Sequence, residues 1–233
     1  MQRQYKTRAE LKSEVKNRLK GNWGTAVKLN LIPSLFTILG MLSFSSAVMI
    51  IYPASYQNLS GYISANNGFG ETIGEWIVDF IFLALAVGIQ YTFLNWMRNE
   101  SFAIRPLGAA FSVFSRKYFV GVFLLFIITK VLTALWSLLL IIPGIIKSYA
   151  YSQTYLVFKD HTDTDGEDAN YMDCITESRQ LMNGNKWRYF VLQLSFIGWG
   201  ILSVLTLGIG LLWLNPYMNA TYAAFYKDLK ENN

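Results

Sequence analysis

The sequence predicts an all-α, polytopic membrane protein with six transmembrane helices, and two observations support this. Hydrophobic residues make up 53% of the 233 positions and charged residues only 15%, with a mean hydropathy of +0.28. Such values are unlike those of a soluble domain of this size. The apolar residues are also gathered into long runs. We therefore expect residues 1–233 to form a single membrane domain.

Four apolar runs are each long enough to cross a bilayer, which takes ~20 mostly apolar residues in a helix. They extend over residues 25–52, 74–96, 118–142 and 189–214. Two shorter segments follow breaks at Pro143 and Pro216. We expect each of them to form a helix that returns across the membrane, which brings the number of spans to six.

Basic residues gather at one end of the expected spans. No Lys or Arg occurs between Pro53 and Ile73, whereas basic segments occupy residues 3–28, 98–117, 159–188 and 227–230. The positive-inside rule then places both termini in the cytoplasm. The polar residues before the first run argue against a signal peptide. The net charge of +5 is thus a topology signal, and we expect no nucleic-acid partner.

A short helix is expected before the first, third and fifth spans. The first begins at Thr7, where Glu10 completes a capping box, and ends at Gly21. The second begins at Pro106 and the third ends at Asn183 and Gly184. Their apolar stripes suit helices that lie in the inner membrane interface. Packing as ordinary connectors under the bundle would explain the same pattern.

Three related segments predict a parallel tandem repeat. "LMNGNKWRYFVLQL" (181–194) resembles "RLKGNWGTAVKLNL" (18–31) and, more weakly, "VFSRKYFVGVFL" (113–124). Each precedes a hairpin of two spans, so all copies keep the same orientation. The expected units are residues 7–97, 102–160 and 168–230, each an interfacial helix followed by a helical hairpin.

The longest of these strings also resemble a known family. "ITESRQLMNGNKWRYFVLQLSFIGW", "LTLGIGLLWLNPYMNATYAAFY" and "LLLIIPGIIKSYAYSQTYLVFKD" are similar to bacterial integral membrane proteins of domain-of-unknown-function family 975. The resemblance covers most of the chain except residues 53–73. It implies a polytopic membrane protein, similar in plan to the membrane domain of some glycerophosphodiester phosphodiesterases. It implies no activity and no catalytic residues.

Basic and aromatic residues stand together where three spans begin at the inner leaflet. One interpretation is that they are ordinary interface anchors. The other is that they recognise anionic phospholipid headgroups in clefts between the repeats. The candidate headgroup residues are Lys20, Trp23, Lys117, Tyr118, Lys186, Trp187 and Arg188.

Charged residues inside the spans form a second candidate site. Lys130 lies twelve residues after Tyr118, roughly 18 Å along a helix and thus near the membrane midplane. Asp79 and Lys147 are expected at matching depths nearer the outer leaflet, so we hypothesise that they pair. The set is either a polar cavity for a headgroup, ion or solute, or an ion pair that fixes helix packing. The candidates are Asp79, Gln90, Lys130, Lys147, Tyr151 and Tyr155.

Signatures of catalysis are missing from the sequence. No Cys-His set, Gly-rich phosphate loop or Gly-x-Ser-x-Gly turn occurs, so we expect no enzyme and no cofactor. Asp163, Asp165 and Gly166 match part of a calcium loop, but its first Asp and bidentate Glu are missing. We therefore expect the segment around His161 to be a solvated cytosolic linker.

These observations favour a non-enzymatic, multi-pass plasma-membrane protein that binds lipid or a membrane-active peptide. Such a protein would act in envelope homeostasis or in protection against antimicrobial peptides, with anionic phospholipids as its main partners. The alternative is a small transporter or channel that uses the polar residues inside the membrane. The scarcity of acidic residues in the spans weakens this alternative, because ion-coupled transport usually needs several.

Overall fold

The computed structural model describes residues 5–35, 38, 69–99, 102, 104, 106–139, 141–165 and 170–232. Every regular element among these residues is a helix. The elements are α1 (Arg8–Leu19), α2 (Trp23–Leu29), α5 (Phe69–Arg98), α6 (Pro106–Ala110), the 3₁₀ helix η1 (Ser112–Phe114), α7 (Phe119–Leu139), α8 (Ile141–Tyr151), α9 (Thr154–Asp165), α10 (Tyr171–Leu181), α11 (Lys186–Leu205) and α12 (Leu211–Glu231). The all-α prediction is confirmed for the described part of the chain.

Three helices are long and apolar enough to cross a membrane. They are α5 over Trp76–Arg98, α7 over Phe119–Trp136 and α11 over Lys186–Leu205. These segments correspond to the second, third and fourth apolar runs of the sequence. Most of the first run, and residues 53–68 of the expected outer loop, lie outside the described residues. The three apolar helices give the chain the character of a membrane protein.

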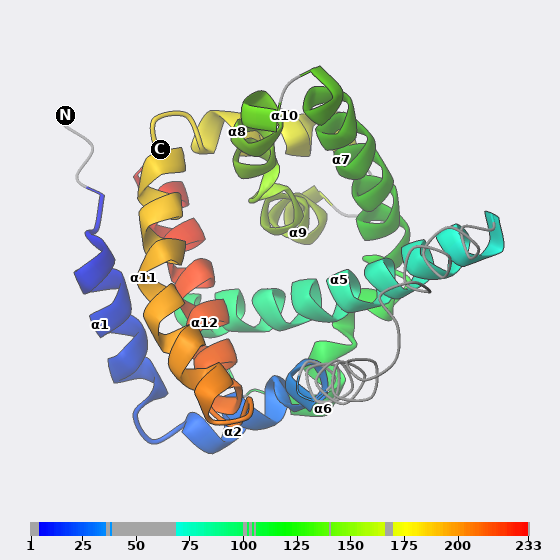
Figure 1. Cartoon of the computed structure of the whole chain (residues 1–233). Coiled ribbons are helices and arrows are strands. Elements are labelled where there is room, and N and C mark those ends of the chain that lie inside the picture. Colours follow the sequence, from blue (N-terminus) through cyan, green and yellow to red (C-terminus); the bar gives the residue numbers. More distant parts are fainter. Residues whose placement is uncertain are drawn as a thin grey trace.

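Two helix pairs border the molecule, and α5 lies across it between them (Figure 1). On one side α7 packs against α8, and on the other α11 packs against α12. α12 also packs along α5, which joins the last pair to the first described span. α9 lies near the centre in Figure 1, in contact with α5, α7 and α10.

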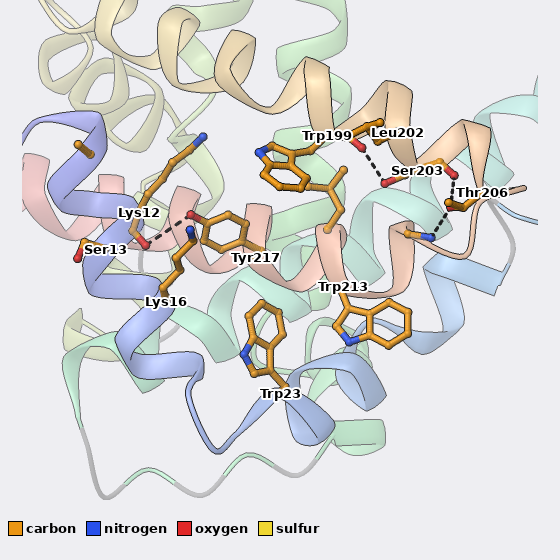
Figure 2. Close-up of a pocket in the computed structure, with 13 residues that line it drawn as sticks. Lys12, Ser13, Lys16, Trp23, Trp199, Leu202, Ser203, Thr206, Trp213 and Tyr217 are labelled. Carbon is orange, nitrogen blue, oxygen red and sulfur yellow. Dashed lines mark hydrogen bonds between the residues drawn. The ribbon is translucent and has the colours of Figure 1, made fainter.

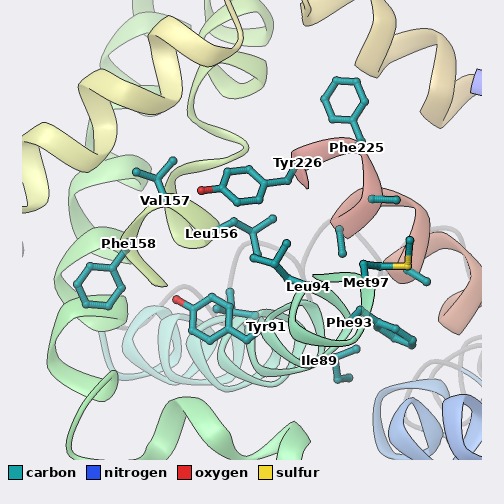
Figure 3. Close-up of a cluster of buried hydrophobic side chains, with 14 of the residues drawn as sticks. Ile89, Tyr91, Phe93, Leu94, Met97, Leu156, Val157, Phe158, Phe225 and Tyr226 are labelled. Carbon is teal, nitrogen blue, oxygen red and sulfur yellow. The ribbon is translucent and has the colours of Figure 1, made fainter. Parts of the chain in front are cut away.

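The buried core lies where α5, α9 and α12 meet (Figure 3). Phe93, Leu94 and Met97 of α5 are almost inaccessible to solvent, as are Leu156 of α9 and Phe225 of α12. Burial of a side chain of this size contributes about 1.5 to 3 kcal/mol relative to exposure. The core therefore holds the last turns of α5 and α12 together and fixes the positions of the helices that pack on them.

The first helix has the expected ends but not the expected use of its apolar face. Thr7 and Glu10 form the predicted capping box, and Gly21 adopts a φ of 84° just after the helix, as a glycine C-terminal signal requires. Its apolar stripe of Leu11, Val15 and Leu19 is buried, and α1 packs on α12. Because this stripe is covered by protein, α1 is a packed connector rather than an interfacial helix with its apolar side in lipid.

The last hairpin turns before the expected proline. α11 ends at Leu205 and α12 begins at Leu211, so Pro216 lies inside α12 and not in the turn. The turn instead uses Leu207 and Gly208, with φ values of 53° and 85°. A left-handed backbone suits glycine because it lacks a Cβ atom. Pro143 likewise lies in the first turn of α8, where proline is tolerated.

The expected return helix after Pro143 is two helices rather than one. α8 ends at Tyr151 and α9 begins at Thr154, and the Ser152 hydroxyl donates to the Tyr149 carbonyl at the break, at 2.8 Å. α9 then continues to Asp165, which corrects the expectation of a solvated linker for residues 161–165. His161 Nε2 lies 2.7 Å from a Glu177 carboxylate oxygen on α10, so this segment is tied to the fold.

Candidate functional site

At the basic-aromatic junction before α7, the side chains of Lys117 and Tyr118 have a partner within the protein. Lys117 Nζ lies 2.6 Å from Asp163 Oδ1. The Tyr118 hydroxyl and the buried Lys159 ammonium donate to the same carboxylate. Partial burial alone would raise the pKa of Asp163, but the hydrogen bonds from the two lysines and Tyr118 outweigh it and lower the pKa to about 2. The Asp163 carboxylate thus pairs with both lysines and offsets one of their two positive charges.

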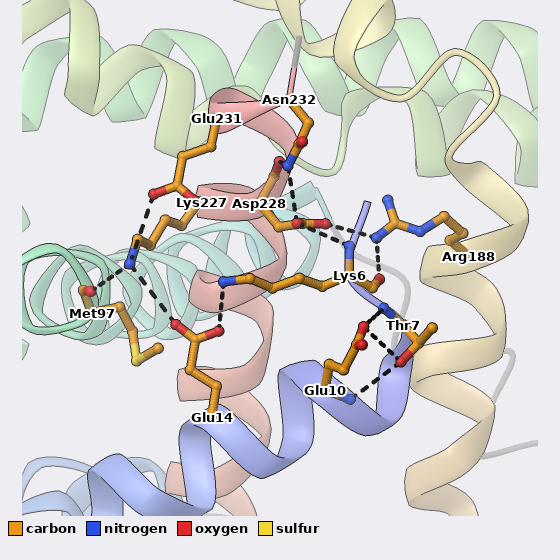
Figure 4. A network of polar contacts seen from close by, with 10 residues as sticks. All are labelled: Lys6, Thr7, Glu10, Glu14, Met97, Arg188, Lys227, Asp228, Glu231 and Asn232. Carbon is orange, nitrogen blue, oxygen red and sulfur yellow. Dashed lines mark hydrogen bonds and ion pairs between the residues drawn. The ribbon is translucent and has the colours of Figure 1, made fainter. Parts of the chain in front are cut away.

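The junction before α11 is also anchored internally, as Figure 4 shows. Arg188 donates to Asp228 Oδ2 at 2.7 Å and to the Lys6 carbonyl oxygen at 2.7 Å. The Asp228 side chain is 0% exposed, so the Arg188 guanidinium compensates a buried charge. Trp187, next to it, is 71% exposed, and Lys186 is half-buried. This junction combines a structural arginine with an outward-facing aromatic ring.

At the junction between α1 and α2, Lys20 is exposed and follows the last residue of α1. Trp23 begins α2 and lies with its ring centroid 6.5 Å from that of Tyr217 on α12. The three junctions that the sequence grouped together therefore differ in the structure. Lys117 and Arg188 have carboxylate partners on other helices. Lys20 and Lys186 form no such ion pair within the described residues.

The charged residues inside the candidate spans pair differently from the hypothesis. Asp79 Oδ2 lies 2.7 Å from Lys130 Nζ, not beside Lys147. Lys130 was expected near the midplane and Asp79 nearer the outer leaflet. Those depths hold only if the cytoplasmic ends of α5 and α7 lie at the same level. The rings of Tyr91 and Tyr118 are instead 5.3 Å apart, so α7 begins seven residues short of the end of α5, and Lys130 reaches the level of Asp79.

The other members of that set lie apart from this ion pair. The Lys147 ammonium lies 4.2 Å from the centroid of the Trp136 ring. The Tyr155 hydroxyl is 3.2 Å from Thr129 Oγ1, while Tyr151 is buried and Gln90 is half-buried. The structure therefore does not gather the six predicted residues into one cavity. Asp79 and Lys130 form a local bridge between α5 and α7.

A groove that the sequence analysis missed lies between α1, α2, α11 and α12 (Figure 2). It has a volume of about 630 Å³, which falls in the ~300 to 1,000 Å³ range of small-ligand sites. Its lining residues are Ala9, Lys12, Ser13, Lys16, Trp23, Trp199, Leu202, Ser203, Thr206, Gly210, Trp213, Leu214 and Tyr217. Two lysines therefore face an aromatic and aliphatic wall.

The lysines lie near one end of the groove and the α11–α12 turn lies at the other (Figure 2). Lys12 Nζ donates to the Ser195 carbonyl oxygen at 3.2 Å and lies 3.9 Å from the centroid of the Phe196 ring. At the turn, Ser203 Oγ donates to the Trp199 carbonyl oxygen at 2.8 Å, and Thr206 Oγ1 donates to that of Ser203 at 2.8 Å. The polar atoms of the turn are thus satisfied, and the lysines supply the charge of the groove.

The groove lysines belong to a basic row along α1. Arg8, Lys12, Lys16 and Lys20 follow one another at a spacing of four residues, which brings neighbouring side chains together on one side of a helix. Within the described residues none of the four forms an ion pair with a carboxylate. Burial, and then the charges of Arg8 and Lys16, lower the pKa of Lys12. This spacing was the sequence signal that could have identified the row.

Comparison with known proteins supplies a family and no described relative. The model of a family described as "Protein of unknown function (DUF975)" matches residues 1–147 and 138–233, which together cover the chain. No curated protein and no solved structure matches it. The likeness in plan to the glycerophosphodiester phosphodiesterase membrane domain stays a prediction.

Proposed function

Because the chain belongs to the family Protein of unknown function (DUF975), which brings no activity to carry over, we propose a function from the geometry of the site. The protein is a non-enzymatic, multi-pass protein of the bacterial cell membrane that binds lipid or a membrane-active peptide, and anionic phospholipid is its main partner. Its cellular role is in envelope homeostasis or in protection against antimicrobial peptides.

The topology belongs to the same proposal. It has six spans, arranged as three parallel tandem repeats with both termini in the cytoplasm. Support comes from two helix pairs that follow similar sequence junctions, α7 with α8 and α11 with α12. Further support comes from the asymmetric placement of Lys and Arg along the chain.

The basic row on α1 is the observation that carries the lipid-binding proposal. Its cations form no ion pairs with carboxylates in the described part of the chain, and the row borders a helix with exposed apolar side chains, including Leu194, Trp199 and Leu202 of α11. Basic residues beside an anionic leaflet contribute about 1 kcal/mol each. A surface that joins unneutralised cations to apolar side chains matches the two ends of an anionic lipid.

Native mass spectrometry of the protein released from its own membrane tests the proposal. We expect anionic phospholipid to remain bound at a defined stoichiometry, and added zwitterionic phospholipid to fail to displace it. Bare protein, or anionic and zwitterionic lipids retained in proportion to their abundance, would reject specific lipid binding.

Solute or ion transport is a second candidate, favoured by the ion pair between Asp79 on α5 and Lys130 on α7. These side chains lie on two of the three candidate spans, and charges at such positions commonly mark conduction paths. Solute flux into proteoliposomes that is abolished by Asp79→Asn would support it. Flux equal to that of empty liposomes would reject it.

A further inference from the structure

We propose that the groove between α1, α2, α11 and α12 binds one anionic lipid, with the headgroup phosphate at Lys12 and Lys16 and an acyl chain along the wall formed by Trp199, Leu202 and Trp213. This inference rests on the proposed function and assigns it a place and a headgroup chemistry. It also moves the binding site away from the junctions before α7 and α11.

The shape of the groove fits an amphiphile. Lys12 and Lys16 come from α1, while Trp199 and Leu202 come from α11 and Trp213 from α12 (Figure 2). Trp199, Leu202 and Trp213 are each more than half exposed, so this wall lacks a protein partner in the described part of the chain. An acyl chain would pack along these side chains and gain dispersion contacts with them.

The positive charge of the groove has no carboxylate partner within the described residues. Lys12 has a carbonyl oxygen and an aromatic ring as neighbours, and Lys16 lies 5.9 Å from the centroid of the Tyr217 ring. These groups stabilise a cation but do not neutralise it, and like charges four residues apart on a helix repel each other. A phosphate would accept hydrogen bonds from an ammonium group and remove this repulsion.

The depth of the lysines strengthens the need for an anion. Lys12 contacts Ser195, which lies nine residues after Lys186, roughly 14 Å along α11 at ~1.5 Å per residue. If α11 crosses the bilayer, this point is well below the headgroups of the inner leaflet. Charges at such depth are costly unless they meet an opposite charge or water. A lipid phosphate drawn into the groove would meet this requirement.

The same charge argues against a cationic peptide in this groove. Membrane-active amphipathic peptides are commonly rich in Lys and Arg, and such a peptide would add like charges beside Lys12 and Lys16. Charge complementarity therefore selects the lipid among the two ligand classes of the proposed function.

Titration with a single-chain probe tests the site. Lysophosphatidylglycerol has one chain and one phosphate without a compensating cation, lysophosphatidylcholine has the same chain with a zwitterionic headgroup, and glycerol 3-phosphate has no chain. Each is titrated against the detergent-solubilised, delipidated full-length protein and followed by native mass spectrometry. We expect lysophosphatidylglycerol to bind best of the three.

Two variants separate the charge from the apolar wall. Lys12→Gln with Lys16→Gln should weaken lysophosphatidylglycerol binding roughly thirtyfold, from about 1 kcal/mol per lysine. Leu202→Trp keeps both lysines and should also weaken lysophosphatidylglycerol binding, because the larger side chain occupies groove volume that the acyl chain would need. The matched control is Lys28→Gln with Arg179→Gln, which removes two exposed cations outside the groove and should bind like the wild type.

The outcomes separate the groove from the wider proposal. If the wild type retains anionic lipid but the lysine variant and Leu202→Trp bind it as well as the control does, the groove assignment is wrong and lipid binding survives elsewhere. If the wild type binds neither native anionic lipid nor the probe, the proposed function itself fails. If glycerol 3-phosphate binds as tightly as lysophosphatidylglycerol, the site is for a soluble phosphate and the inference is overturned.

Discussion

Two sets of basic residues in this molecule have similar sequence character but opposite surroundings. Lys117 before α7 and Arg188 in the first turn of α11 meet carboxylates that other helices supply, those of Asp163 and Asp228. The row on α1 that contains Lys12 and Lys16 meets none in the described residues. A cation with a carboxylate partner holds helices together, whereas a cation without one remains available to an anionic ligand. The difference directs the search for function to α1.

Removal of Asp228 should have the largest effect on stability. Its buried carboxylate accepts hydrogen bonds from Arg188 and from the Lys6 backbone N–H. Breaking a buried ion pair by removing one partner typically costs about 3 to 5 kcal/mol. We expect Asp228→Ala to lower the thermal unfolding temperature strongly, while Asp173→Ala on the exposed face of α10 changes it little. Equal effects would show that the paired junction is not structural.

Breaking the ion pair between α5 and α7 should have the next largest effect on stability. Asp79→Lys or Lys130→Asp places like charges together in two candidate spans, and a charge without a partner there costs at least ~2.5 to 3.5 kcal/mol. The charge swap Asp79→Lys with Lys130→Asp should recover most of the folded, monodisperse protein in size-exclusion chromatography. The swap of Asp79 with Lys147 should not. Rescue by the second swap alone would contradict the observed pairing.

Loss of the Asp163 carboxylate should have a moderate effect that depends on pH. Because its pKa is lowered to about 2 in the folded protein, below about 3.9 for a free Asp, the carboxylate stabilises the fold above pH 4. This contribution is lost as the pH falls from about 4 to 2. We expect Asp163→Asn to cost about 1 kcal/mol at pH 7, since the side chain is partly exposed and solvent weakens its ion pairs.

A pH titration of thermal stability checks this expectation. The difference between wild type and Asp163→Asn should shrink as the pH falls through that window. A difference that stays constant down to pH 2 would mean that the carboxylate charge is not what stabilises the junction.

The smallest stability effect is expected on α1. Lys12→Gln with Lys16→Gln removes no ion pair. It loses the contacts of Lys12 with Ser195 and Phe196 but relieves the repulsion between the two lysines, and these effects oppose each other. The free energy of unfolding of the lipid-free protein should therefore change by less than about 0.5 kcal/mol. Chemical denaturation of delipidated protein measures this directly. Strong destabilisation would show that the row is structural, like the other junctions.

The sequence predicted features that depend on neighbouring residues better than those that depend on register between helices. The capping box at Thr7 and the helix end at Gly21 were both correct because caps depend on residues within one turn. The turn at Gly208 was missed because a proline was given more weight than a glycine. The partner of Asp79 was missed because depths counted along the sequence hold only if neighbouring helices end at the same level. The packing of α5 against α7 sets that offset, and the sequence does not show it.

The groove could not be predicted for a related reason. Lys12 and Ser195 are 183 residues apart in the chain, and nothing local in either segment indicates that α1 lies beside α11. The basic row itself was readable as a spacing of four residues in Arg8, Lys12, Lys16 and Lys20. The lack of carboxylate partners for this row was not readable from the sequence. Glu14 lies close to the row in the chain, but in the structure its carboxylate pairs with Lys6 and Lys227.

The most direct test compares the groove lysines with the lysines at the junctions of α7 and α11 in one measurement. Native mass spectrometry should count the anionic phospholipid retained from the native membrane by Lys12→Gln with Lys16→Gln and by Lys117→Gln with Lys186→Gln. Each variant removes two positive charges. We predict that the first loses the lipid and that the second, if it remains folded, keeps it. Loss from the second with full retention by the first would contradict the account and return the site to the junctions.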